Sequence, residues 1–376
     1  MPIYLDHGAT TPTRPEVIAL ITEVMQSQWG NPSSLHTWGE RAAMSIERAR
    51  LQVADLLNAD ATNVIFTSGG TESDNLAIFG IARRYRVPQH MITSAVEHSA
   101  IEQSVKLLEQ AGWQITRLPV NQQGSIEPAD LVKALQPNTV LVSIIYGQNE
   151  VGTLQPIEKL GKICREAGVW FHTDAVQTVG RLPLDLQKLP VDLLSISSHK
   201  LYGPQGVGAL FVRPEVELVP LLMGGGQENG MRSGTQPVAS IAGFGLAAQL
   251  ADRELETEFR RLSRLRDRLF TKLADIPDLL PIGASGAQRL PHHASFCYSH
   301  LNGRQIVRAM NQAGIAISAG SACSSGAILP SPVLLAMGFT ESQALGAIRI
   351  TLGKATTDRD IEFTAETLKQ ILKPKI

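Results

Sequence analysis

Short apolar runs alternate with helical patterns through the middle of the chain. Runs in which nearly every residue is apolar are typical of strands that are buried on both faces. The predicted strands are Val64–Thr67, Met91–Ser94, Gln114–Leu118, Val140–Ile145, Trp170–Thr173, Leu193–Ser197 and Gly208–Val212. Because most of them are followed by a helical pattern or a turn, we expect an α/β fold with a mostly parallel central sheet flanked by helices.

Several segments between and after these runs show helical spacing. Apolar residues three and four positions apart predict helices over Trp38–Leu57, Ser99–Ala111 and Ile157–Ala167. A much longer helical pattern begins near Pro237 and continues to about Leu273. The alternation of strands and helices therefore gives way here to one long helix.

The pattern after that helix predicts a smaller α+β domain. Its elements are strands near Ala294–Tyr298, Ala316–Ser318 and Ala347–Thr351, helices near Gly303–Ala313 and Ser331–Met337, and a last helix after Thr357. We therefore expect an N-terminal arm over residues 1–15, counted with the small domain. A large domain follows over 16–250, and the small C-terminal domain over 251–376.

Composition narrows the class of protein. The formal charge of the 376 residues is −1, so we expect neither a nucleic-acid nor a membrane-surface partner. The three cysteines are far apart and form no CxxC, which argues against a disulfide framework and against a metal site. The sequence starts without a secretory signal pattern, and the apolar stretch 238–251 is too short to span a membrane. We therefore expect a cytoplasmic protein.

Polar residues whose side chains could act in catalysis or binding follow the predicted strands. Lys200 lies just beyond one strand, where desolvation could turn it into a nucleophilic amine, although a solvated loop lysine is the alternative. Asp174 ends another strand and could pair with a cation such as a protonated pyridine, or cap the next helix. His98 and Asn149 end two more strands, where His98 could stack on a flat cofactor or be structural.

A glycine-containing turn adds a candidate anion site. The segment Phe66–Leu76 passes from a strand through two glycines into a helix, whose N-terminus could cradle a phosphate; a plain strand–helix turn is the alternative. Ligands bind at the carboxyl ends of parallel strands. The convergence of these strand ends is therefore stronger evidence for a ligand site than any single residue.

The ordered set of motifs resembles a known family. GGTES, EHS, QNEVG, HTDAVQ, SSHKLYGPQGVG, GGGQENGMRSGT, SAGSACSSG and IRITLGK resemble the NifS/IscS-type cysteine desulfurases, which are class-V aminotransferases. The resemblance covers essentially the whole chain. It implies the PLP-dependent transferase fold (type I), pyridoxal 5′-phosphate (PLP) as cofactor, and a homodimer with the active site at the subunit interface.

The resemblance also assigns roles to single residues. It implies that Lys200 forms the Schiff base with PLP, that Asp174 binds the pyridinium nitrogen and that His98 stacks on the ring. Gln177 and Asn149 would contact the ring oxygen and the substrate. The phosphate would be held by Gly70, Thr71, Ser197 and His199, and by Thr235 of the neighbouring subunit. Arg349 would bind the substrate carboxylate; by position alone it reads as a surface ion pair.

Cys323 is the expected acceptor of sulfur. It lies among small residues in Ser318–Ala327, unlike a structural cysteine, whereas Cys164 and Cys297 follow apolar patterns and are expected to be buried. The resemblance implies that Lys200 removes the α-proton of L-cysteine and that His98 accepts the thiol proton. The Cys323 thiolate then takes the sulfur as a persulfide and L-alanine leaves.

Other activities on the same fold stay open. A PLP-dependent cystine or selenocysteine lyase and an aminotransferase would share the cofactor site, but an aminotransferase would not need Cys323. A non-catalytic scaffold is a further alternative. For the sulfur acceptor, we expect an iron–sulfur scaffold protein first and a tRNA-thiolation or other acceptor second.

Overall fold

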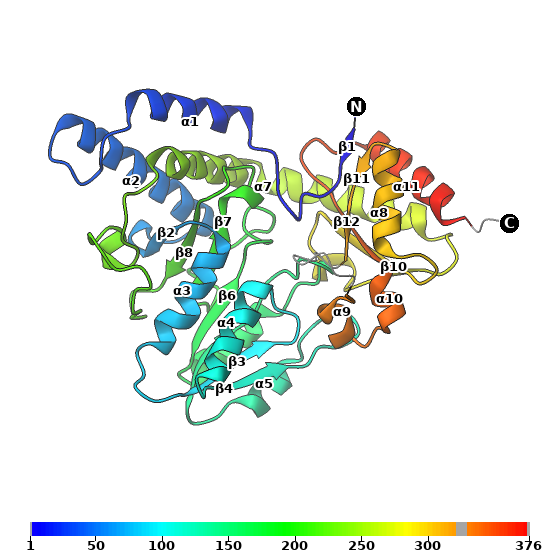
Figure 1. Cartoon of the computed structure of the whole chain (residues 1–376), viewed down its shortest axis with the longest axis horizontal. Coiled ribbons are helices and arrows are strands. Elements are labelled where there is room, and N and C mark those ends of the chain that lie inside the picture. The colour runs from blue at the N-terminus through cyan, green and yellow to red at the C-terminus, as the bar shows by residue number, and fades with distance from the viewer. Residues whose placement is uncertain (1, 321–328, 374–376) are drawn as a thin grey trace.

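A computed structural model describes residues 2–320 and 329–373 of the chain. Its largest element is a sheet of seven strands in the order β2-β8-β7-β6-β5-β3-β4 (Figure 1). The strands are β2 (Val64–Thr67), β3 (His90–Ser94), β4 (Gln114–Leu118), β5 (Thr139–Ser143), β6 (Trp170–Asp174), β7 (Leu193–Ser197) and β8 (Gly208–Val212). The expected α/β fold with a mostly parallel sheet is confirmed.

Strand β8 is antiparallel to both of its neighbours. A loop with one short 3₁₀ turn, and no crossover helix, joins β7 to β8, so the chain reverses direction and pairs at once with the strand it has just left. The remaining pairs of this sheet are parallel. This loop carries Lys200, which therefore lies at the carboxyl end of β7.

Helices cover the large sheet on both faces. The helices are α1 (Pro15–Ser27), α2 (Thr37–Leu57), α3 (Gly70–Ala82), α4 (Ser99–Gln110), α5 (Pro128–Ala134), α6 (Ile157–Glu166) and α7 (Val238–Leu273). Adjacent strand residues enter different cores: Phe66 packs with residues of α2, α6 and α7, while Ile65 packs with residues of α3 and α4. This two-sided burial explains the near-continuous apolar runs in the sequence.

A four-stranded antiparallel sheet forms the second core, in the order β12-β13-β10-β9. Its strands are β9 (Leu279–Pro281), β10 (His293–Tyr298), β12 (Ser318–Ala319) and β13 (Ala347–Thr351). Around it lie α8 (Gly303–Gln312), α9 (Pro332–Ala336), α10 (Glu341–Leu345) and α11 (Asp358–Leu372). Figure 1 shows α7 extending from the helices of the large sheet to α11. The exact boundary between the two domains stays a prediction.

The N-terminal arm joins the second core through a parallel pair. Strand β1 (Ile3–Tyr4) pairs with β11 (Ile315–Ala316), and Asp6 makes a further bridge to Thr351. We predicted one strand over Ala316–Ser318, but this segment divides into β11 and β12, which belong to different sheets. Among the described residues, no helix has the length and apolar character needed to cross a membrane.

Candidate active site

A cavity of about 330 Å³ lies at the carboxyl ends of the parallel strands. It is lined by Gly8, Ala9, Gly70, Thr71, Asp74, His98, Ile145, Asn149, Asp174, Val176, Gln177, Ser197, His199, Lys200, Ser318 and Arg349. A neighbouring hollow of about 410 Å³ shares Ala9, Gly70, Thr71, Ser197 and His199 with it. The fold thus brings most of the predicted site residues to one place, as expected for strand ends of a parallel sheet.

Lys200 is half-buried in this cavity and is not a solvated loop lysine. Its Nζ donates to the carbonyl oxygens of Gly8, at 2.5 Å, and Ala9, at 2.8 Å. The pKa of Lys200 is lowered to about 8, mainly by burial and also by the charge of Arg349, while the charge of Asp174 acts in the opposite direction. A lysine with a lowered pKa reaches its neutral, nucleophilic form more readily than a surface lysine.

Asp174 ends β6 and is 4% exposed. Its Oδ1 accepts a hydrogen bond of 2.9 Å from the amide of Val176, and a turn rather than a helix follows, so its interpretation as a helix cap is wrong. Burial raises the pKa of Asp174, while the charges of His98 and Lys200 act in the opposite direction. A buried carboxylate here is suited to a cationic partner.

The turn between β2 and α3 forms the wall of the cavity. Gly69 has a φ of +153°, and α3 begins at the next residue. A Cβ on Gly70 would lie 2.7 Å from Cγ2 of Val176, so a larger residue here would push aside another side chain of the cavity lining. The first turn of α3 directs free amides and its positive dipole end toward the cavity, an arrangement that suits a phosphate.

His199 is uncharged in this arrangement. Burial lowers the pKa of its imidazole to about 4, with the charge of Lys200 acting in the same direction. Its Nδ1 lies 3.0 Å from Oγ1 of Thr10, which fixes the ring beside the hollow. A contact between His199 and an anion would therefore be a hydrogen bond rather than an ion pair.

His98, Asn149 and Gln177 meet in the same cavity. Nδ1 of His98 accepts a 3.2 Å bond from the amide of Ala100 and thereby caps α4, so this residue is structural as well as cavity-lining. Oδ1 of Asn149 is buried and has no hydrogen-bond partner among the described residues. Nε2 of Gln177 donates to the carbonyl of Gly8 at 3.0 Å. An unpaired buried amide oxygen is typical of a site that awaits a ligand.

Arg349 is 6% exposed, so its interpretation as a surface ion pair is wrong. Its NH1 donates to the carbonyl of Asn149 at 3.0 Å, and its NH2 lies 2.9 Å from Oδ1 of Asp6. Its Nε is buried without a partner in the part of the chain that the structure describes. The guanidinium is thus held at the cavity by two contacts, and its Nε donor is unpaired.

The cysteines and Thr235 lie in different environments. Cys164 and Cys297 are buried, and burial raises the pKa of each thiol to about 12, which confirms that they fill the core. Thr235 is exposed and is not among the residues that line the cavity or the neighbouring hollow. Cys323 lies outside the described residues.

Sequence reasoning missed three acidic residues at the site. Asp6 pairs with Arg349, Asp74 lines the cavity, and Glu97 is buried beside His98. Asp74 directly follows the GGTES segment and Glu97 begins the EHS segment, so their position next to predicted ligand residues was the available signal. The contact of Asp6 depends on how the arm docks, which no local pattern reveals.

Comparison with known proteins identifies the family. The family model for aminotransferase class-V matches residues 3–363, and the chain belongs to this family. The chain is 43% identical to the protein named cysteine desulfurase IscS of Dictyoglomus turgidum, over 99% of this chain and 94% of that one. It is 42% identical to the mouse protein named cysteine desulfurase, over 97% and 80% of the two chains.

Solved structures give the same result. A structure titled NifS-like protein superposes with a TM-score of 0.93 at 34% identity and covers 99% of both chains. A structure titled SspA in complex with cysteine has a TM-score of 0.80 at 35% identity and covers 93% of this chain and 98% of that chain. These neighbours confirm the type I fold of the PLP-dependent transferases.

The residues of the cavity fit the cofactor of this family. Class-V aminotransferases are PLP-dependent, and a lysine of the fold holds the cofactor. Here the cavity offers an amine of lowered pKa, a buried carboxylate, an unpaired amide oxygen and a glycine-walled helix N-terminus. These are the groups that an aldehyde, a pyridinium nitrogen, a polar ring substituent and a phosphate require.

Proposed function

We propose that this protein is a cysteine desulfurase that converts L-cysteine to L-alanine and holds the released sulfur as a persulfide on Cys323. The observation that carries this proposal is the cavity in which the Lys200 amine, Asp174 and Arg349 meet. Relatives named cysteine desulfurase match nearly the whole chain, and the neighbour SspA is described in complex with cysteine. PLP, when bound, supplies an aldehyde for amines and a ring that withdraws electrons from the substrate α-carbon.

Four protein residues would bind the substrate, transfer its protons and contact the cofactor ring. Arg349, whose N–H donors are only partly used within the chain, would bind the carboxylate of cysteine beside the Asn149 amide. The Lys200 amine would remove and return the proton of the α-carbon, a role that suits a pKa of about 8. His98 would lie against the cofactor ring and accept the proton of the substrate thiol. Asp174 would face the ring nitrogen.

The same proposal assigns the phosphate to the glycine-walled end of the cavity. Gly70, Thr71, Ser197 and His199 would hold it, since all four line both the cavity and the neighbouring hollow. Gln177 would contact the ring oxygen. Each assignment follows the family pattern residue by residue.

The sulfur step requires no external oxidant. The Cys323 thiolate attacks the sulfur of the bound substrate, a new S–S bond forms, and the C–S bond of the substrate breaks. The electron pair of that bond stays with the carbon fragment, which takes up a proton and leaves as alanine. An external thiol or an acceptor protein would then remove the sulfur from Cys323.

A homodimer would complete the site. Large apolar side chains are exposed along α1, α2 and the segment between them, namely Ile18, Met25, Trp29, Leu35, Trp38, Met44 and Leu51; we call this surface the α1–α2 face. Several exposed large apolar side chains on two neighbouring helices and the segment between them favour a subunit interface. Thr235 does not line the cavity of its own chain, which favours contact with the phosphate of the other subunit.

The sulfur acceptor is proposed from the relatives. Several of them are named IscS, which favours an iron–sulfur scaffold protein as the first candidate and another sulfur acceptor as the second. With such an acceptor the protein would act in the cytoplasm.

Two variants test this function. Lys200→Ala should lose the yellow absorption of bound PLP and all alanine formation; normal activity in this variant would contradict the proposal. Cys323→Ala should keep the absorption but form no persulfide and little alanine, whereas Cys297→Ala should behave as wild type. Alanine release by Cys323→Ala at the wild-type rate would instead favour a lyase, and parallel assays with cystine and selenocysteine would identify it.

A further inference from the structure

Asp74 is a buried acid for which the proposed reaction has no role. It lies on α3, four residues after the glycine that begins the helix, and it is 1% exposed. It lines the cavity together with Asp174 and Lys200. Its Oδ1 is buried and accepts no hydrogen bond from any described residue. Such an atom needs a physical explanation.

The surroundings of Asp74 contain more acids than cations. Asp174 and Glu97 are buried acids that act on it electrostatically, and no described Lys or Arg forms an ion pair with it. One ligand atom each from Asp74, His98 and Asp174 lie within 4.8 Å of one another. Two carboxylates this close cannot both be ionised without a large cost in a buried site.

His172 does not supply the missing charge. Its Nε2 lies 3.7 Å from Oδ1 of Asp74, beyond hydrogen-bond distance. The ring is already engaged, with Nδ1 2.8 Å from the Ser143 hydroxyl and Nε2 3.0 Å from that of Ser195. Burial lowers the pKa of His172 to about 3, so the imidazole is neutral near pH 7.

We propose that Asp74 is a positioning residue that stays a neutral carboxylic acid, so that Asp174 carries the negative charge facing the ring nitrogen of the cofactor. This inference rests on the proposed function, since it assumes that Asp174 meets that nitrogen. The neutral acid would fill the space beside Asp174 without competing for the pyridinium proton.

The two acids differ in what stabilises their ionised forms. Asp174 accepts the Val176 amide and has the charges of His98 and Lys200 nearby. For Asp74, burial raises the pKa of the carboxyl well above its usual range, and the charge of Asp174 acts in the same direction, as does that of Glu97 when it is ionised; the Ser195 hydroxyl opposes them. The proton shared between the two neighbours therefore resides on Asp74.

Glu97 is the third acid that faces this group. Its Oε1 accepts hydrogen bonds from the Ser94 hydroxyl, at 2.5 Å, and the Ile145 amide, at 3.0 Å, and its Oε2 has no described partner. Burial raises the pKa of Glu97 to about 8, and the charge of Asp174 contributes in the same direction. Glu97 is therefore also largely protonated near pH 7, and the test needs to separate it from Asp74.

A protonated Asp74 makes the stability of the apoprotein depend on pH. Above the ordinary aspartate pKa of about 4, the unfolded chain releases the proton of residue 74 while the folded chain keeps it. The folded state then binds one more proton, so its stability falls as the pH rises toward the raised pKa. From this group alone, the unfolding equilibrium constant should increase about tenfold per pH unit.

The experiment compares urea unfolding of wild-type apoprotein with Asp74→Asn between about pH 5 and about pH 7. Asparagine keeps the shape of the neutral acid without a titrating proton, so the ratio of the two unfolding constants should change about tenfold per pH unit. Glu97→Gln, measured in parallel, identifies the contribution of the other acid. A ratio that does not depend on pH would overturn the proposal, as would a dependence that appears only after a chelator removes a bound divalent ion.

Absorption spectra of the PLP-loaded variants provide the second measurement. Asp74→Asn should keep the wild-type absorption of the cofactor, because the group it replaces is already neutral, whereas Asp174→Asn should change it. Equal changes in both variants would show that Asp74 carries charge. If Asp74→Asn does not fold, the infrared band of a protonated carboxyl in the wild type at neutral pH, compared with Glu97→Gln, decides the question. Since unfolding of the apoprotein involves no substrate, its outcome is independent of whether the protein is a desulfurase.

Discussion

Single residues from distant parts of the chain define the carboxylate end of the cavity. Arg349 comes from β13, and the carboxylate that orients it, Asp6, comes from the N-terminal arm. The pair is largely buried, so a substrate carboxylate would meet a guanidinium whose direction is already fixed. Orientation of this kind lowers the cost of binding.

The Asp6→Asn variant tests this role. The amide keeps an acceptor oxygen but loses the charge, so we expect the KM for cysteine to rise about tenfold, the worth of one charge-assisted hydrogen bond. The turnover number and the absorption of bound PLP should change little. Asp252→Asn, at an exposed position, is the control. A lower KM in Asp6→Asn would mean that Asp6 competes with the substrate instead of orienting Arg349.

Site residues could be predicted from the sequence only where a local pattern, such as the end of a strand, marks their position. Lys200 and Asp174 stand at the ends of recognisable strands, and parallel pairing brings such ends together. Asp6 could not be placed, because its position depends on the pairing of β1 with β11, more than three hundred residues away in sequence. Asp74 lies on a helix whose buried face has no clear periodicity, so its burial could not be predicted, and its place beside the predicted phosphate residues was the only signal.

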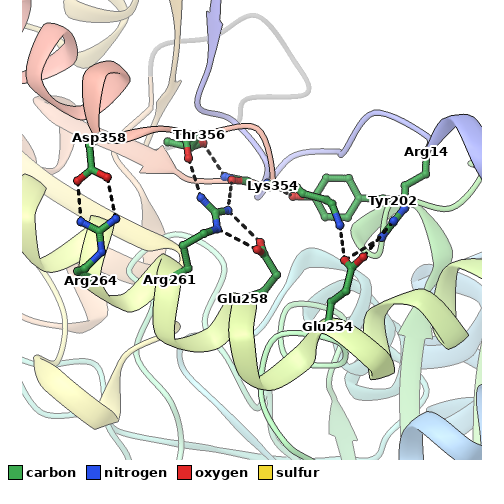
Figure 2. A network of polar contacts seen from close by, with 10 residues as sticks. Arg14, Tyr202, Glu254, Glu258, Arg261, Arg264, Lys354, Thr356 and Asp358 are labelled. Atoms are coloured by element: carbon green, nitrogen blue, oxygen red, sulfur yellow. Dashed lines mark hydrogen bonds and ion pairs between the residues drawn. The ribbon is translucent and has the colours of Figure 1, made fainter.

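At the scale of elements, helix α7 links the arm, the Lys200 loop and the second core. Figure 2 shows polar side chains along this helix. Glu254 forms ion pairs with Arg14 of the arm and with Lys354 of the loop after β13. Arg264 forms an ion pair with Asp358 of α11. The amide of Lys354 also donates to the Tyr202 hydroxyl at 2.7 Å, close to Lys200. These contacts hold together the segments that surround the cavity.

The Glu254→Gln variant measures the worth of this link. Burial raises the pKa of Glu254, but hydrogen bonds from Arg14 and Lys354 outweigh it and the pKa is lowered. Because the group is partly exposed, we expect a loss of only about 1 kcal/mol in the free energy of unfolding. The contribution should be present at neutral pH and disappear as the pH falls through the lowered pKa.

Urea unfolding of the two proteins at neutral and acidic pH provides the measurement. Glu256→Gln removes an exposed pair with Arg260 on the same helix and should cost less. If both variants lose the same stability, the link has no special importance.

Elements were predicted with good accuracy where burial imposed a pattern, as in the strands of the large sheet. The antiparallel direction of β8 was not predicted, because the direction of pairing depends on the connection rather than on the strand itself. Strands β11 and β12 were merged, because two short strands with one residue between them show a single pattern.

At the scale of the whole molecule, the α1–α2 face is exposed in the single chain. We expect Met44→Glu to weaken the homodimer, because a charge would be buried at the proposed interface. The monomer should also retain PLP less well, since Thr235 of the other subunit would be lost. Light scattering during size-exclusion chromatography measures the mass, with Leu107→Glu on α4 as an exposed apolar control. A monomeric wild type would contradict the proposed assembly.

The central claim is that cysteine sulfur is transferred to Cys323 and that alanine leaves. The most direct measurement is one incubation of the PLP-loaded protein with L-cysteine that does not exceed the protein chains in number, in the absence of any other thiol, so that excess substrate cannot discharge the persulfide; alanine is quantified and the protein mass determined. The account predicts about one alanine per chain, one additional sulfur atom on the Cys323 peptide, and no further product until a thiol is added. Continuous alanine formation with Cys323 unmodified, or free sulfide with pyruvate instead of alanine, would contradict it.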